Sequence, residues 1–394
     1  MAEAERQFTS VEICAGAGGQ AVGLHQAGFR HRALIEIDEH ACRTLEANVK
    51  GRREWAGCQV LRQDLTQFSH EKLGLAEKEL DLLAGGVPCP PFSAAGKQLG
   101  EDDERDLFPD MLRLVDALLP KAVMIENVRG LLEPPQKFQA YRDRIAQRLT
   151  DAGYEICMWD VLEARDFGVP QLRPRAILVA MLPEYAMHFD PHPLRHPKFE
   201  TKSVADALKK SMRERFRTHG AEGWEKAYKR WLKMANRGVA PTLVGGSKKH
   251  GGADLGPTRA KREWLRLGVD AMGVANNPEE MEDAVRDLYS QDKATKAPLG
   301  PKLTVRQAAI LQGFPDNWAF TGRKTAAYRQ VGNAFPPPVA RAVGVQIKMA
   351  LQAGPQVVPQ DFALFDLPEQ DSRSRFHGPE PLHRRNDLEG AVVG

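Results

Sequence analysis

The stretch that decides the fold is residues 11–21, Val-Glu-Ile-Cys-Ala-Gly-Ala-Gly-Gly-Gln-Ala. A short apolar run with β-branched residues leads into the spacing Gly-x-Gly-x-x-Ala at Gly16, Gly18 and Ala21. This order predicts a strand, a tight turn and a helix, and glycines in such a turn let the backbone approach a bound ligand closely. Sites for NAD, FAD and S-adenosylmethionine all have this form, and so does a turn that binds nothing.

The same rhythm continues through residues 8–182, where five short apolar runs alternate with stretches of helical spacing. It predicts an α/β fold with a parallel or mostly parallel sheet covered by helices on both faces. Ligands of such sheets bind at the carboxyl ends of the strands, so residues that directly follow the runs are functional candidates. The runs are 11–14, 33–37, 81–84, 122–126 and 177–180, and the helical stretches start at Ala21, Glu39, Asp106 and Lys137.

Composition narrows the class of protein. The 394 residues are 42% hydrophobic and 27% charged, with a formal net charge of +3. This is typical of a folded globular protein, without a run of about 18 apolar residues to span a membrane or an apolar secretory signal. The five cysteines form no CxxC pair, so we expect no metal site, no disulfide framework and a cytoplasmic location.

Charge is unevenly distributed beyond residue 182. Residues 201–266 hold 17 Lys and Arg against 6 Asp and Glu, while residues 267–292 hold 1 Arg against 7 acidic residues. The small net charge is therefore a cancellation. We expect a core at 8–182 that resumes at 301–352, an inserted domain at 183–300 and a loosely ordered tail at 353–394.

Cys89 stands out from the other cysteines. It lies in residues 85–97, Gly-Gly-Val-Pro-Cys-Pro-Pro-Phe-Ser-Ala-Ala-Gly-Lys, directly after an apolar run and between Pro88 and Pro90. A lone cysteine is usually a buried small apolar residue. A proline-flanked position at the ligand edge of the sheet instead favours a nucleophile.

Charged residues follow two further runs. Glu36 lies at the end of the second predicted strand, where a carboxylate can bind both hydroxyls of a ribose. Glu126 lies in Met-Ile-Glu-Asn-Val-Arg at the end of the fourth, as either a proton donor or an ion-paired strand end. Arg173 and Arg175, in Gln-Leu-Arg-Pro-Arg, face the same way on an extended chain and could hold an anion or a carbonyl, or simply be solvated.

Two elements complete the set. Residues 303–315 predict a short helix that ends at a glycine, and residues 330–340, Gln-Val-Gly-Asn-Ala-Phe-Pro-Pro-Pro-Val-Ala, predict a turn leading into a helix. Together with the motifs above, over about 9–182 and 303–350, the sequence resembles the bacterial DNA (cytosine-5)-methyltransferase family of type II restriction-modification systems. The resemblance implies a Rossmann-like, S-adenosylmethionine-dependent catalytic domain and a small inserted target-recognition domain.

The resemblance also implies a role for each catalytic residue. Cys89 is the nucleophile that attacks C6 of a cytosine flipped out of double-stranded DNA. Glu126 contacts N3 and the exocyclic amine of that base, and Arg175 contacts O2. Arg173 supports the loop, and Pro88 positions it.

Further residues are assigned to the cofactor and to DNA. Glu36 binds the ribose hydroxyls of S-adenosylmethionine, and Asp64 binds its adenine amine. Three glycines line the methionine end of the cofactor, and two further residues complete its pocket: Gly16, Gly18, Gly19, Leu107 and Asn333. Gln171, Lys248 and Lys249 are assigned to substrate.

Three positions depart from the family pattern. Cys14 stands where phenylalanine is usual, Pro90 where glutamine is usual, and Ile37 where an aromatic residue is common. Cys14 puts an edge contact to the adenine of the cofactor in doubt. Pro90 puts in doubt whether the catalytic loop has the family's usual form near the DNA backbone. None removes a catalytic group, so we expect an active enzyme.

Three alternatives are weighed against this interpretation. An NAD-dependent oxidoreductase would leave Cys89, Glu126 and Arg175 without a task. An RNA (tRNA) cytosine-5 methyltransferase would share the scaffold, whereas a basic insert of this size suits duplex DNA. A DNA-binding protein with a dead site would lack Cys89 or Glu126. We also expect a monomer, a cognate restriction endonuclease acting on the same site and no membrane partner, while the recognition sequence stays open.

Overall fold

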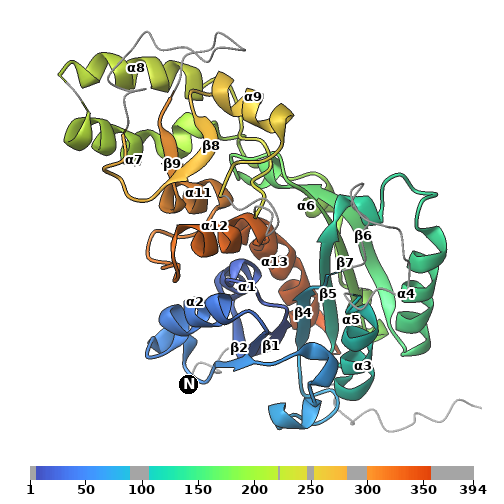
Figure 1. Ribbon diagram of the computed structural model, residues 1–394. Helices are drawn as coiled ribbons and strands as arrows, with labels where there is room; N and C mark the ends of the chain where they lie inside the picture. The colour runs from blue at the N-terminus through green and yellow to red at the C-terminus, as the bar shows by residue number, and fades with distance from the viewer. Residues whose placement is uncertain (1–5, 89–105, 221, 246–252, 282–299, 356–394) are drawn as a thin grey trace, which may run out of the picture. The chain divides into compact units, whose positions relative to one another are not determined.

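A seven-stranded sheet with the order β3-β2-β1-β4-β5-β7-β6 is the main element of the computed structural model (Figure 1). The structure describes residues 6–88, 106–220, 222–245, 253–281 and 300–355. Strands β1 to β5 run parallel, and β7 runs antiparallel to both β5 and β6. The strands are β1 (Phe8–Ile13), β2 (Phe29–Glu36), β3 (Gln59–Arg62), β4 (Leu82–Gly86), β5 (Ala122–Val128), β6 (Glu155–Glu163) and β7 (Pro174–Met181).

Burial explains which strands the sequence reveals. The central strands β4 and β5 are covered on both faces, so the first four residues of each are all apolar and buried. The edge strand β3 has only four residues and no buried side chain, and the apolar-run pattern does not mark it. The predicted α/β, mostly parallel and Rossmann-like fold is confirmed.

Helices cover both faces of this sheet, with α1 and α13 on one side and α3 and α4 on the other (Figure 1). Small residues let α1 and α13 pack closely, because a Cβ added to Gly344 would lie 2.9 Å from the Cβ of Ala27. The helices are α1 (Gly19–Ala27), α2 (Glu39–Val49), α3 (Phe108–Leu118), α4 (Gln139–Asp151), α5 (Pro183–Ala186), α6 (His192–Arg195) and α13 (Pro337–Ala353). The predicted start of α2 is confirmed, whereas α1 starts two residues earlier than predicted and α3 and α4 start two residues later.

Residues 204–333 add helices around a small parallel sheet of β8 and β9. Buried side chains such as Leu208, Trp264 and Tyr328 join these helices in a second apolar core. On α7, the buried Arg215 donates hydrogen bonds to the Lys302 carbonyl at 2.9 Å and to Gln307 Oε1 at 2.7 Å. The elements are α7 (Val204–His219), α8 (Trp224–Ala235), α9 (Thr258–Arg266), β8 (Asp270–Ala275), β9 (Lys302–Thr304), α11 (Val305–Gln312) and α12 (Lys324–Asn333).

Two predictions in the last third of the chain have different outcomes. The short helix is confirmed as α11, which ends at Gly313 in the left-handed conformation, φ +89°. The turn predicted within residues 330–340 is confirmed in part: it lies at 334–336 and leads into α13, whereas residues 330–333 form the end of α12. The domain boundaries stay a prediction, and residues 356–394 lie outside the described residues. Among the helices that the structure describes, none has the length and apolar character needed to cross a membrane.

Candidate active site

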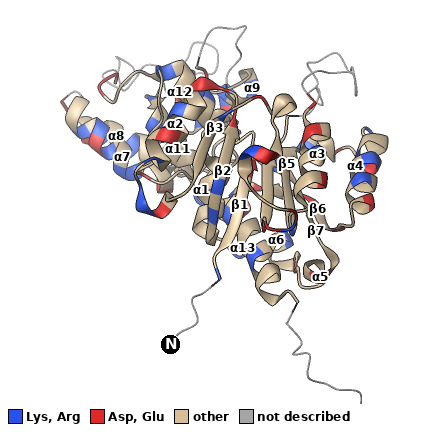
Figure 2. Ribbon diagram, turned by 90° about the horizontal axis from the view of Figure 1, so that it is seen from below, with Lys and Arg blue, Asp and Glu red and all other residues tan. Residues whose placement is uncertain are grey.

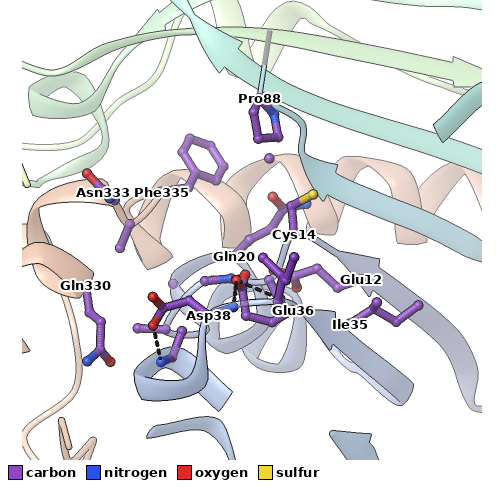
Figure 3. Close-up of a pocket in the computed structure, with 18 of the residues that line it drawn as sticks. Glu12, Cys14, Gln20, Ile35, Glu36, Asp38, Pro88, Gln330, Asn333 and Phe335 are labelled. Atoms are coloured by element: carbon purple, nitrogen blue, oxygen red, sulfur yellow. Dashed lines mark hydrogen bonds between the residues drawn. The ribbon is translucent and has the colours of Figure 1, made fainter. Parts of the chain in front are cut away.

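A cavity of about 400 Å³ opens at the carboxyl ends of β1, β2, β4 and β5. Figure 3 shows Pro88 at one end of it and Glu36 with Asp38 at the other. Gly86 and Glu126 also line the cavity, so residues at or near the carboxyl ends of four different strands share one space. The size falls within the usual range for a small-molecule site.

The glycine loop and Glu36 are joined by hydrogen bonds. The Gly16 amide donates to Glu36 Oε2 at 2.7 Å, and the amides of Ile37 and Asp38 donate to Oε1 at 2.9 and 2.8 Å. Gly16 has φ +53°, a conformation that L side chains rarely adopt. Three backbone donors thus fix the carboxylate at the cavity wall.

The three glycines of the loop have different surroundings. Gly16 and Gly19 line the cavity, whereas Gly18 does not. Gly18 has φ +85°, and a Cβ there would lie 2.7 Å from the Trp318 ring and 2.9 Å from Leu45. The structure thus places Gly18 against Trp318 and Leu45, and its role in cofactor binding stays a prediction.

Two buried polar residues of the cavity were missed by the sequence reasoning. Glu12 and Gln20 are 1% and 3% exposed, and both line the cavity. In the described structure, Glu12 Oε2 and Gln20 Nε2 have no hydrogen-bond partner. Burial, reinforced by the charge of Glu36, raises the pKa of Glu12 well above its ordinary value. An acidic residue inside a buried strand was the signal that could have identified Glu12.

Cys14 also lines the cavity, in the position where the resemblance expects phenylalanine. Its backbone has φ +49°, in the left-handed region. Burial raises the pKa of its thiol to about 12, and among the nearby charges Glu36 contributes most to this rise. A thiol that holds its proton so firmly is a poor nucleophile.

The remaining predicted cofactor residues also reach the cavity, namely Asp64, Leu107 and Asn333. Asp64 follows β3 and accepts hydrogen bonds from the Thr66 amide at 3.0 Å and the Thr66 hydroxyl at 2.8 Å. The Leu107 amide donates to the Pro88 carbonyl at 3.2 Å. This bond joins the chain just before residues 89–105 to the chain just after them. Residues 89–105 lie outside the described residues and include Cys89.

At the other end of the cavity, Glu126 pairs with Arg175. Arg175 Nε lies 2.7 Å from Glu126 Oε1, with the two side chains 14% and 15% exposed. They face each other because β5 and β7 are antiparallel neighbours, with Val128 opposite Arg175. Asn127 Nδ2 donates to the Val87 carbonyl at 2.9 Å and so ties β5 to the segment before Pro88.

Known proteins agree with this arrangement. The family model of C-5 cytosine-specific DNA methylases matches residues 8–349. The chain belongs to this family. It is 50% identical over 342 residues to the type II methyltransferase M.NaeI of Lentzea aerocolonigenes, covering 86% of this chain and 75% of the relative. It is 47% identical over 350 residues to M.NgoMIV of Neisseria gonorrhoeae, covering 88% and 99%. It is a DNA cytosine-5 methyltransferase of the bacterial type II class.

Solved structures agree at the level of the fold. A methyltransferase of Entamoeba histolytica, EhMeth, aligns with a TM-score of 0.57 and 16% identity, covering 87% of this chain and 99% of that one. A DNA modification methyltransferase encoded within an E. coli prophage aligns with a TM-score of 0.55 and 21% identity, covering 88% and 99%. The family uses S-adenosylmethionine as methyl donor.

Gln171 and Arg173 lie inside this methylase rather than at the cavity. Gln171 is 0% exposed, and its Oε1 accepts from the Leu243 amide at 2.8 Å, so the contacts that the structure shows for it are structural and its contact with substrate stays a prediction. Arg173 is 1% exposed and donates to the carbonyls of Leu243 at 2.6 Å and Gly332 at 2.9 Å. Burial lowers the pKa of the Arg173 guanidinium.

The predicted DNA contacts Lys248 and Lys249 lie outside the described residues, as does the predicted nucleophile Cys89. The other four cysteines are free thiols. Within the described ranges, no group of three or more His, Cys, Asp or Glu side chains could hold a metal ion.

Proposed function

We propose that this methylase transfers a methyl group from S-adenosylmethionine to C5 of a flipped-out cytosine in a specific short double-stranded DNA sequence. One observation carries the proposal: Glu36 and Glu126 line the same cavity as Pro88, the residue before Cys89. A cofactor at Glu36 and a base at Glu126 would share one water-restricted space. Their reacting atoms would meet beside the predicted nucleophile.

The described residues fit the cofactor. Its methionine end carries an ammonium and a carboxylate, and the cavity holds an unpartnered acceptor and an unpartnered donor, Glu12 Oε2 and Gln20 Nε2. Its ribose would exchange hydrogen bonds with Glu36, and Asp64 would accept from the adenine amine. When bound, S-adenosylmethionine supplies an electrophilic methyl group.

The Glu126–Arg175 pair is the proposed receptor for cytosine. In this reading the Glu126 carboxyl group, in its protonated form, donates to N3 and accepts from the exocyclic amine, while the Arg175 guanidinium donates to O2. Each group already faces the other at 2.7 Å, so the base would be bound by side chains that are held in place beforehand. Polarising the ring in this way lowers the electron density at C6 and favours nucleophilic attack there.

Cys89 is the proposed nucleophile. Its sulfur bonds to C6, and the electron pair of the C5–C6 double bond moves to make C5 reactive. After C5 has taken the methyl group, a base removes the C5 proton, the double bond re-forms and the sulfur leaves as thiolate. A stacked base pair would shield C6 from the sulfur, so the cytosine must leave the helix first.

Residues 183–300 are the proposed target-recognition domain. Figure 2 shows blue Lys and Arg positions along the ribbons of α7 and α8. The exposed ones include Lys209, Lys210, Arg213, Lys226, Lys229 and Lys233. Such side chains suit phosphate contacts, and Lys248 and Lys249 would reach phosphate or a base edge. We further propose a cytoplasmic monomer that protects host DNA from a cognate restriction endonuclease.

Bisulfite sequencing tests the proposal. Plasmid DNA from a host without its own cytosine-5 methylation should gain one short protected sequence when this chain is expressed. Expression of Cys89→Ser should leave every cytosine convertible. A protected site in RNA but none in plasmid DNA would overturn the proposed substrate.

A further inference from the structure

Segment 240–245 of the insert is fixed to the catalytic core by its backbone. The Ala240 amide donates to the Pro170 carbonyl at 2.8 Å, and the Ala240 carbonyl accepts from the Leu172 amide at 2.8 Å. Three residues later, the Leu243 amide donates to Gln171 Oε1 at 2.8 Å. The position of this segment is thus set directly by residues that precede β7.

Arg173 extends this attachment to the end of α12. Its two terminal nitrogens donate hydrogen bonds to the carbonyls of Leu243 and Gly332. These residues lie 70 and 159 positions further along the chain than Arg173. Gln171 Nε2 adds a bond to Gln312 Oε1 at 2.5 Å, and Gln312 in turn donates to the Ala334 carbonyl. One buried guanidinium therefore holds the insert and α12 together.

At the contact itself, Gly245 rests on the wall of the cavity. A Cβ added to Gly245 would overlap Asn333 Oδ1 and lie 3.1 Å from the Arg329 carbonyl. A Cβ added to Gly332 would lie 2.5 Å from the Gly245 nitrogen. Asn333 and Arg329 both line the cavity, and Figure 3 shows Asn333 at its edge.

We infer that Gly245, although part of the insert, is a positioning residue for the cofactor site. Its lack of a side chain lets the insert backbone pack against Asn333 and hold that amide at the cavity wall, with Arg173 as the clamp. The inference rests on the proposed function, because it takes the ligand of this cavity to be S-adenosylmethionine. Gly245 also directly precedes residues 246–252, which include the predicted DNA contacts Lys248 and Lys249.

Calorimetry of S-adenosylhomocysteine binding to the full chain tests this inference. Gly245→Ala should weaken binding by about 10-fold, the scale of one lost hydrogen bond to a ligand. Gly238→Ala is the matched control in the same insert, because a Cβ there meets nothing within 4 Å. It should bind within about twofold of the wild type, as expected for an exposed substitution away from such contacts.

A double-mutant cycle with Asn333→Ala separates positioning from general destabilisation. Once the amide is gone, Gly245→Ala should cost little more affinity, so the two effects should be strongly non-additive. Additive losses, or a Gly245→Ala affinity equal to that of the wild type, would overturn the inference. If Gly245→Ala does not fold, Arg173→Lys carries the test, since lysine cannot span both carbonyls and should also weaken binding. A wild-type chain that binds no S-adenosylhomocysteine would instead refute the proposed function.

Discussion

The two halves of the cavity hold their carboxylates in different ways. In the half around Glu36, three backbone amides satisfy the charge, and Gly16 lies only 20 residues from Glu36. In the half around Glu126, another charged side chain, Arg175, does so from an antiparallel strand. The first carboxylate depends on the loop backbone, whereas the second depends on one replaceable partner. Substitutions should therefore have separable effects in the two halves.

The largest expected effect comes from removing that partner. Arg175→Met leaves the half-buried Glu126 unpaired and removes the proposed donor to cytosine O2, so methyl transfer should slow by roughly 100- to 1000-fold. Affinity for S-adenosylhomocysteine should be unchanged. Single-turnover transfer from a radiolabelled methyl donor gives the rate, and calorimetry gives the affinity.

The matched variant in the other half should behave in the opposite way. Glu36→Ala should weaken cofactor affinity by roughly 10- to 100-fold and leave DNA binding nearly intact. If Arg175→Met lost cofactor affinity as Glu36→Ala does, the division of the cavity into two halves would be wrong.

A smaller effect should distinguish Glu12 from Glu36 within the cofactor half. Burial and the Glu36 charge raise the pKa of Glu12, so the folded state holds this proton more tightly than the unfolded state. The stabilising contribution is complete below the ordinary value of 4.5 and is lost as the pH rises through the folded pKa. Without cofactor, Glu12→Gln should therefore raise stability at pH 8 by more than about 1 kcal/mol, with the difference shrinking toward acid pH.

Urea unfolding at several pH values measures this difference. Asp64 is a suitable control, because its carboxylate already accepts hydrogen bonds from Thr66 at the cavity rim. Asp64→Asn should not reproduce the pH-dependent gain. A Glu12→Gln curve parallel to that of the wild type at every pH would contradict the account of Glu12.

The local half of the site was the more predictable one. Gly16 and Glu36 follow consecutive strands of one βαβ unit, so a motif and its spacing suffice to bring them together. Glu126 and Arg175 were assigned individually through the family resemblance, and their direct pairing depends on β7 running antiparallel to β5. The sequence indicated a mostly parallel sheet without indicating that reversal.

The surroundings of three other residues could not be predicted, for physical reasons. Gln171 is predicted to contact substrate, whereas the structure buries it through contacts with residues 72 and 141 positions away, which no local pattern reveals. Gly18 fits the glycine motif, and the structure packs it against the Trp318 ring. Trp318 is held there by a hydrogen bond from its Nε1 to the carbonyl of Ala17, which lies 301 residues earlier in the chain. Glu12 was overlooked because a single acidic residue hardly alters the apolar pattern of a strand. The surroundings of Gln171 and Gly18 are set by residues distant in the sequence, and Glu12 is a buried acidic residue within the otherwise apolar run 11–14.

The central claim is that Cys89 bonds to the target cytosine, and covalent trapping tests it most directly. A duplex that carries the mapped site with 5-fluorocytosine at the target position should form a complex that requires S-adenosylmethionine and survives denaturing electrophoresis. Fluorine cannot leave C5 as a cation, so elimination of the sulfur stops. Peptide mapping should place the adduct on Cys89, and Cys89→Ser should abolish it. Trapping that persists in Cys89→Ser, or that maps to Cys14, Cys42, Cys58 or Cys157, would contradict the mechanism.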